Sequence, residues 1–185
     1  MRADARAKRA AVLTAAVDVF TERGVDTALD EVARRAGVGI ATLYRHFPTR
    51  EALITGAYVQ QIGVLCDGVE ELLGVLPPDE ALIIWMQNFV GQVAGRPGMA
   101  QALKTVVLAT DHDAVALSHA KVYSALEELL NAGVEAGLFR TDVTVDDLAG
   151  ALSGFSLSVG TPGSQDRANR LIRLLVDGVK VTAGE

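Results

Sequence analysis

The sequence predicts an all-α protein with a small three-helix N-terminal domain and a larger C-terminal helical domain. Apolar residues recur with a helical period in almost every segment, and no run of strict apolar–polar alternation is long enough for a strand. Helix-ending glycines and a proline occur within the first 48 residues, so we expect three helices there, the second and third of them short. The expected domains are residues 1–48 and 49–185, with about nine helices in all.

The first helix is predicted over residues 5–23. Leu13, Val17 and Phe20 recur on one of its faces, and Gly24 supplies the stop. This apolar face needs partners, and the following short helices are the nearest ones available.

The second and third helices are short. Thr27 is expected to cap the second, with Asp30 three residues later as a short capping box, and Gly37 ends it. The third is predicted over residues 40–47, where Pro48 closes it.

A fourth, longer helix is expected to begin at a Thr49 cap and to continue to about Gly74, linking the two domains. The two prolines after Leu76 are the clearest break in the rest of the chain. Beyond them the periodicity predicts five more helices, near residues 79–94, 97–110, 113–136, 145–159 and 165–181.

Composition excludes several classes of protein. The chain is 50% hydrophobic and 22% charged over 185 residues, which is ordinary for a globular protein. Its single cysteine, Cys66, rules out an intrachain disulfide framework and suits a reducing compartment. The first ten residues lack the apolar core of a secretory signal, and the longest apolar run, residues 81–86, is far below the ~20 that span a bilayer. We therefore expect a cytoplasmic protein with no membrane partner.

The charge is distributed unevenly. Residues 1–50 hold nine Lys and Arg against six Asp and Glu, a net +3, whereas the remainder carries −9. A basic N-terminal part and an acidic remainder are consistent with a polyanion partner for the N-terminal part. A solvated helix surface would give the same small excess, and charge alone favours that reading.

Residues 27–47 have the plan of a helix-turn-helix: two short helices joined by Gly37-Val38-Gly39 and preceded by a longer one. In such a motif the second short helix enters the DNA major groove. Projection of this helix on a wheel places Leu43 and Phe47 toward the core. The side facing away is predicted to present Ala41 and Arg45, flanked by Thr42 and Tyr44, with Ile40 and His46 at its margins.

Further phosphate contacts are expected around this helix. Arg50 and the free amides at the start of the fourth helix form one such site, and the Thr27 hydroxyl is another candidate. The basic residues near the N-terminus either follow the DNA backbone or form a frayed, solvated end; they are Arg2, Arg6, Lys8 and Arg9.

Three stretches, Phe20–Gly24, Val32–Val38 and Thr42–Leu53, together with Thr27, closely resemble the DNA-binding domain of the TetR family of transcriptional regulators. The resemblance covers about residues 7–57 without a gap. It implies an all-helical homodimer that binds a near-palindromic operator in double-stranded DNA and is released by a small-molecule ligand.

Carried over by position, the resemblance implies phosphate contacts at Thr27, Tyr44, His46 and Arg50. It implies positions at or near base edges for Gly39, Ile40, Ala41, Thr42 and Arg45. Two positions depart from the family pattern, since many members have Ser at position 39 and Lys or Arg at position 40. The base preference of those members therefore does not transfer to this chain.

The C-terminal domain is expected to hold a small, largely apolar effector. The residues that could line its pocket lie on the middle helices and are Trp85, Phe89, Leu103, Val107, Leu108 and Tyr123. For any one of them, a place in the ordinary core is the competing interpretation.

The last two predicted helices have the character of a dimer surface. Two apolar stripes carry this expectation, formed by Leu148, Leu152, Phe155 and Val159 and by Leu171, Leu174 and Leu175. Gly150 and Gly154 would let a neighbouring helix approach closely, so two helices from each subunit could form a four-helix bundle. The same surface could instead be closed inside a monomer.

No catalytic function is expected, because no nucleophile, base and orienting group occur at usable spacing. No metal or cofactor is expected either, since His112 and His119 are about 10 Å apart along a helix. The alternative that remains open is a helical protein-interaction module whose helix-turn-helix no longer reads DNA.

Overall fold

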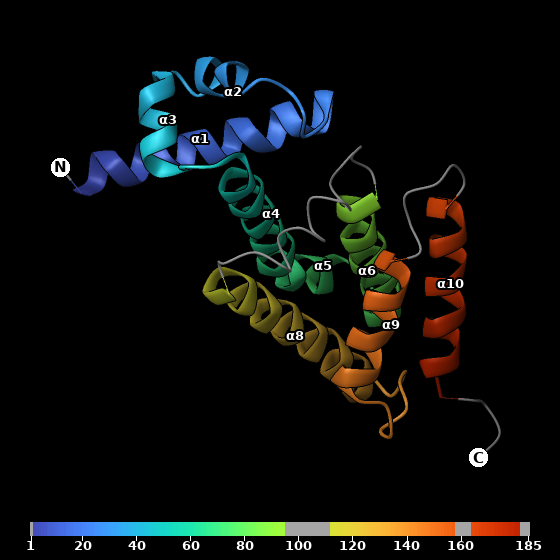
Figure 1. Ribbon diagram of the computed structural model, residues 1–185. Helices are drawn as coiled ribbons and strands as arrows, with labels where there is room; N and C mark the ends of the chain where they lie inside the picture. The colour runs from blue at the N-terminus through green and yellow to red at the C-terminus, as the bar shows by residue number, and fades with distance from the viewer. Residues whose placement is uncertain (1, 95–111, 158–163, 182–185) are drawn as a thin grey trace. The chain divides into compact units, whose positions relative to one another are not determined.

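The computed structural model describes residues 2–94, 112–157 and 164–181 (Figure 1). Apart from one isolated antiparallel bridge between Phe139 and Lys180, these residues contain no strand, so the predicted all-α fold is confirmed. They form nine helices: α1 (Arg2–Arg23), α2 (Leu29–Arg35), α3 (Ile40–His46), α4 (Arg50–Asp67), α5 (Val69–Val75), α6 (Pro78–Ala94), α8 (His112–Glu135), α9 (Val145–Leu157) and α10 (Ser164–Val179).

The contacts divide the described residues into two compact units. The first contains residues 2–61 and 112–116, and the second contains residues 62–94 and the described residues from 117 onward. The boundary expected after residue 48 marks the start of α4, whereas the contacts group α4 as far as Gln61 with the preceding helices. The predicted helix over 97–110 lies outside the described residues.

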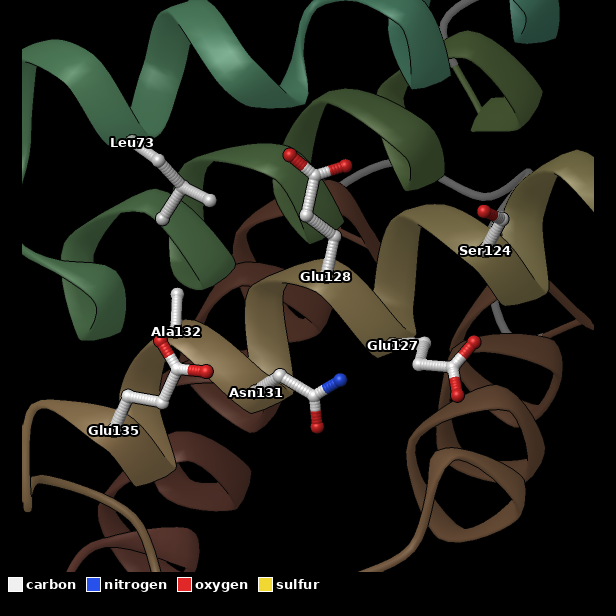
Figure 2. Close-up of a pocket in the computed structure, with 7 residues that line it drawn as sticks. All are labelled: Leu73, Ser124, Glu127, Glu128, Asn131, Ala132 and Glu135. Carbon is white, nitrogen blue, oxygen red and sulfur yellow. The ribbon is translucent and has the colours of Figure 1, made fainter.

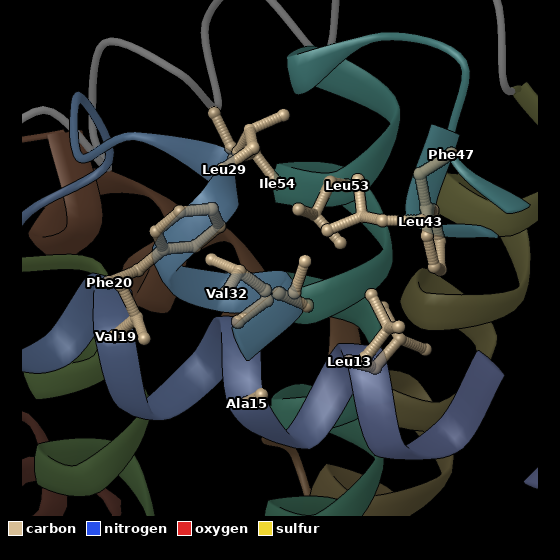
Figure 3. Packing of buried hydrophobic residues seen from close by; sticks show 14 of the residues in the cluster. Leu13, Ala15, Val19, Phe20, Leu29, Val32, Leu43, Phe47, Leu53 and Ile54 are labelled. Carbon is tan, nitrogen blue, oxygen red and sulfur yellow. The ribbon is translucent and has the colours of Figure 1, made fainter. Parts of the chain in front are cut away.

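One apolar core holds α1, α2, α3 and the start of α4 together (Figure 3). Burying a leucine or phenylalanine side chain contributes about 1.5–3 kcal/mol, so this cluster is the main stabilising element of the unit. Its buried leucine, isoleucine and phenylalanine residues are Leu13, Phe20, Leu29, Leu43, Phe47, Leu53 and Ile54.

The predicted helix stops are confirmed. Gly24 and Gly37 have positive φ angles of 81° and 66°, a conformation that non-glycine residues rarely adopt. Phe47, which precedes Pro48, leaves the helical region with φ −135° and ψ 89°. The Thr49 hydroxyl accepts a hydrogen bond from the Ala52 amide at 3.1 Å, so this residue caps α4 as predicted.

The predicted cap at Thr27 is wrong. The N-cap of α2 is Ala28, and no side chain caps this helix. The Thr27 hydroxyl instead donates to the carbonyl of Arg23 at 3.3 Å, because the carbonyls at the end of α1 lack helical partners.

The single helix predicted from Thr49 to Gly74 is also wrong in its second half. Gly68, with φ −88° and ψ 3°, separates α4 from the short helix α5. Residues on both sides are helical, so only a one-residue interruption marks the break. Periodicity cannot detect such an interruption, because the apolar spacing continues across it.

In the second unit α6 is the central helix and contacts α5, α9 and α10. The ends of α8 and α10 are joined through the Phe139–Lys180 bridge, where the Arg140 amide donates to the Val179 carbonyl at 3.0 Å. Lys180 also pairs with Asp79 at 2.8 Å, which ties the end of α10 to the start of α6. The ammonium of Lys180 holds the pKa of the Asp79 carboxyl below its ordinary value.

Within the described residues, one helical stretch, residues 50–75, passes a test of length and apolarity for a membrane span. Core helices of globular proteins pass the same test, and Leu53, Ile54 and Ala57 of this stretch are buried in the first unit. This is weak evidence for a membrane-spanning helix.

Candidate nucleic-acid interface

The exposed face of α3 matches the wheel projection. Leu43 and Phe47 are buried, while Ala41, Tyr44 and Arg45 are exposed. Tyr44 is 47% exposed although it is a large aromatic residue, and the remaining predicted contacts of this helix, Ile40, Thr42 and His46, are half-buried at its margins. The predicted orientation of the helix is therefore confirmed.

Gly39 is the N-cap of α3, and its backbone conformation does not require a glycine. Its φ of −71° suits any residue, and a Cβ built there meets no atom within 4 Å. Its carbonyl accepts hydrogen bonds from the amides of Thr42 and Leu43 at 2.8 and 3.2 Å. The fold therefore tolerates a side chain at position 39, and the glycine leaves the start of α3 bare.

Ion pairs between α1 and α2 and within α2 neutralise two of the basic residues of the N-terminal part. Arg35 donates from both terminal nitrogens to Glu22, at 2.6 and 2.8 Å, and Arg34 pairs with Glu31 at 2.6 Å. The hydrogen bond from Arg35 lowers the pKa of Glu22, and that from Arg34 lowers the pKa of Glu31. These two arginines therefore stabilise the motif more than they add free positive charge to it.

The basic N-terminal part of α1 lies next to the end of α3. The guanidinium of Arg9 stacks over the ring of Phe47 at 5.0 Å from its centroid, a cation–π contact. Lys8 pairs with Asp4 one turn away at 2.9 Å. The structure describes this segment as helical, whereas the sequence left a frayed end as the alternative.

Arg50 has a role that the sequence did not suggest. Its Nη1 donates to the backbone carbonyls of Val25 and Thr27, at 2.6 and 2.7 Å. The guanidinium expected to contact a phosphate thus holds the turn between α1 and α2. Only the folded chain brings the two segments together, so no local pattern could reveal this pairing.

Two of the residues predicted to line an effector pocket lie in the core of the second unit. Trp85 and Phe89 are buried and stacked with ring centroids 5.7 Å apart, and the Trp85 indole N–H donates to the Leu65 carbonyl at 3.1 Å. Tyr123 is exposed on α8. Leu103, Val107 and Leu108 lie outside the described residues.

The described residues also contain a polar hollow with a volume of about 420 Å³ between α5 and α8. Figure 2 shows Leu73 projecting from α5 toward α8, along which three carboxylates are spread. The lining residues are Leu73, Ser124, Glu127, Glu128, Asn131, Ala132 and Glu135. This lining is polar, whereas the sequence predicted an apolar pocket. Glutamates on a helix surface usually form a solvated face, so the sequence pattern did not indicate a hollow here.

The predicted dimer residues divide into covered and uncovered groups. Leu148 and Leu152 are buried within the chain itself and leave almost no surface for a partner. On α10, Leu174 is 67% exposed and Leu171 is also exposed, while Leu175 and Phe155 are half-buried. Val159 lies outside the described residues.

No group of three or more His, Cys, Asp or Glu in the described part of the chain is arranged to hold a metal ion. The polar constellation with the clearest geometry is therefore the exposed face of α3. A short helix held on a packed three-helix core, with small and cationic residues facing outward, defines a helix-turn-helix DNA-binding protein.

Comparison with known proteins identifies the family. Residues 12–57 match the family described as bacterial regulatory proteins, tetR family, and residues 77–181 match the C-terminal domain of SbtR-like transcriptional regulators. The chain therefore belongs to the TetR family of transcriptional regulators.

Two solved structures are similar over nearly the whole chain. A TetR transcriptional regulator from Streptomyces coelicolor is 44% identical, with 95% of this chain and 99% of that chain covered and a TM-score of 0.76. A TetR transcription regulatory protein from Mycobacterium vanbaalenii is 33% identical, with 97% and 99% covered and a TM-score of 0.68.

A curated relative, the HTH-type transcriptional activator FasR of Mycolicibacterium smegmatis, is 37% identical over 67 residues, which are 36% of this chain and 31% of that protein. The curated relatives are thus matched over less than half of their own length.

Proposed function

We propose that this protein is a sequence-specific transcriptional regulator, and that it acts as a repressor released from its operator by a small-molecule ligand. The observation that carries the proposal is the exposed face of α3, which presents Ala41, Tyr44 and Arg45 from a helix fixed by Leu43 and Phe47. Its relatives are regulators rather than enzymes, and we propose the same for this chain, acting in the cytoplasm.

The residues of α3 suit two kinds of contact. Gly39 and Ala41 allow the backbone to come close to base edges, with Ile40, Thr42 and Arg45 beside them, while Tyr44 and His46 reach phosphates. Thr27 remains a candidate phosphate contact, because its half-buried side chain lies just ahead of the start of α2.

A homodimer would place two such helices on one face of the duplex, about 34–36 Å apart for half-sites one turn apart. The exposed leucines of α10 support this proposal, as do Gly150 and Gly154 of α9, where an added Cβ would meet no atom of the same chain within 4 Å. The operator is then a near-palindrome.

Selection of bound duplexes from a random pool, at moderate and at higher salt, tests the proposal. We expect enrichment of a motif with two-fold symmetry that survives the higher salt. Binding without a motif, lost steeply with salt, would show phosphate attraction alone and overturn sequence-specific reading. No binding at all would favour the alternative, a helical protein-interaction module.

The ligand response requires a second measurement. Trp85 is the single tryptophan and is buried in the second unit, so its fluorescence reports on changes there. We expect a small molecule that changes this fluorescence to weaken binding to the selected duplex by roughly 5–150-fold, the usual size of such coupling. A compound library in which no member changes both quantities would count against ligand-released repression.

A further inference from the structure

The side chain of Arg50 holds the turn between α1 and α2 by hydrogen bonds, although Arg50 is not part of that turn. This residue begins α4, and one of its guanidinium nitrogens, Nη1, donates to the carbonyls of both Val25 and Thr27, at 2.6 and 2.7 Å. An arginine Nη group carries two N–H donors, so both donors of this nitrogen are used. Hydrogen bonds from a charged donor are about twice as strong as neutral ones.

The turn has weaker bonds of its own. The Thr27 amide donates to the Gly24 carbonyl at 3.4 Å, and the Thr27 hydroxyl donates to the Arg23 carbonyl at 3.3 Å. Both distances lie beyond the usual range for strong hydrogen bonds, whereas both bonds from Arg50 are short. Arg50 therefore supplies the shortest hydrogen bonds to this turn, while the buried Leu29 anchors the start of α2 in the core.

The start of α4 is itself fixed against α1 and the end of α3. Leu53 and Ala57 are fully buried in the same core as Phe47. A Cβ added at Gly56 would lie 2.8 Å from a methyl carbon of Leu13 and 3.0 Å from the Phe47 ring, so the glycine lets α4 approach both closely. Arg50 adds the α1–α2 turn to this rigid group.

We propose that Arg50 is a positioning residue for DNA binding, which acts by clamping the α1–α2 turn to α4 and not by binding a phosphate. The clamp sets the start of α2 at a fixed position relative to α3, so that both reach the duplex together. This inference rests on the proposed DNA-binding function.

The test compares Arg50→Met, which removes the donors, with Arg50→Lys, which keeps a charged donor. Amide hydrogen exchange is measured in the free full-length protein at Thr27 and Glu31, whose amides donate to the Gly24 and Ala28 carbonyls. Affinity for the selected duplex is measured across a range of salt concentrations. For Arg50→Met we expect exchange to rise about tenfold and affinity to fall about tenfold, as loss of charged hydrogen bonds allows. The slope of log affinity against log salt is expected to stay at the wild-type value.

Lys121→Met is the control, because it removes one positive charge from a surface ion pair on α8, outside both α3 and the proposed interface on α10. It should leave exchange at Thr27 and Glu31, affinity and slope unchanged. If Arg50 acts as a clamp, Arg50→Lys should restore the protection of the turn against amide exchange and the DNA affinity to the same extent.

Several outcomes would overturn the proposal. A phosphate contact predicts that Arg50→Met reduces the salt slope by about 0.9, whether or not exchange in the turn changes. The proposal would also be overturned if Arg50→Lys restored DNA affinity without restoring the protection of the turn against exchange. It would likewise be overturned if Arg50→Met raised exchange in the turn and left DNA affinity unchanged. If the wild-type protein binds no duplex, the proposed function fails first, and the exchange measurement then shows whether the clamp itself exists.

Discussion

At Gly133 the absence of a side chain makes room for an aromatic ring. A Cβ built at this position of α8 would overlap the ring of Phe139, which is fully buried. The amides of Leu138 and Phe139 both donate to the Gly133 carbonyl, at 2.9 and 3.1 Å, and Gly137 has a φ of +68°. The chain thus turns back on itself after α8 and places the ring where a side chain at 133 would stand.

We expect Gly133→Ala to lower the free energy of unfolding by about 1–3 kcal/mol, as overpacking in a core does. Urea unfolding followed by the fluorescence of Trp85, which lies in the same unit, measures this change. Gly74→Ala is the control, because a Cβ there meets no atom within 4 Å. An equal effect in both variants would mean that helix propensity, and not the Phe139 ring, decides the outcome.

Cys66 is expected to be an unreactive thiol. Burial raises its pKa to about 11, because desolvation disfavours the thiolate, although Lys121 acts in the opposite direction. At pH 8 its alkylation by iodoacetamide should be about two orders of magnitude slower than that of a free thiol, since only the thiolate reacts. The rate should rise with pH until about 11 and should reach the free-thiol value in urea. Fast alkylation of the folded protein at pH 8 would contradict this assignment.

At the scale of elements, α3 can be tested without disturbing the fold. Ala41 is exposed at the centre of the proposed DNA face, so a carboxylate there would lie against the anionic duplex. We expect Ala41→Glu to weaken binding to the selected duplex at least about 100-fold while the melting temperature stays within a few degrees of wild type. The control is Ala120→Glu on the exposed side of α8, which should bind like the wild-type protein. Unchanged binding by Ala41→Glu would remove α3 from the interface.

The orientation of α3 could be predicted from the sequence, whereas the clamp on the α1–α2 turn could not. Leu43 and Phe47 are four residues apart, and a spacing this local determines which side of a helix is buried. Arg50 meets Val25 and Thr27 only after the chain has folded, and its partners are backbone atoms, which leave no trace in a residue pattern. The Thr27 cap failed for a similar reason, since the hydroxyl donates to a backbone atom, the Arg23 carbonyl.

In the whole molecule, apolar spacing identifies buried faces but not what covers them. The helical spacing of Trp85 and Leu148 is the same as that of residues that line a pocket or an interface, yet both side chains are buried within their own unit. The sequence predicted an apolar pocket, whereas the hollow next to Leu73 is polar. The glutamates along α8 are typical of a solvated helix face, so they did not indicate a concave surface. On α10, by contrast, Ile172 and Val176 are buried while Leu171 and Leu174 are exposed, so one helix supplies core and surface together.

The exposed leucines of α10 give the last prediction, which concerns assembly. Leu174 is 67% exposed, and a solvent-facing leucine on a helix whose opposite face is already buried is suited to a second copy of the chain. We expect Leu174→Glu to shift the protein from dimer to monomer in sedimentation velocity, because two symmetry-related carboxylates would then meet at the interface. The helical circular dichroism should be unchanged, since the side chain is not part of the core.

Loss of the dimer should also weaken binding to a palindromic duplex far more than binding to a half-site, because each monomer keeps its own α3. Val75→Glu is the control, as Val75 is 74% exposed on α5 and should leave both assembly and binding unaltered. A Leu174→Glu protein that remains dimeric would place the interface elsewhere. A monomer that still binds the palindrome with wild-type affinity would instead separate DNA reading from dimerisation, and the two-fold operator would then need another explanation.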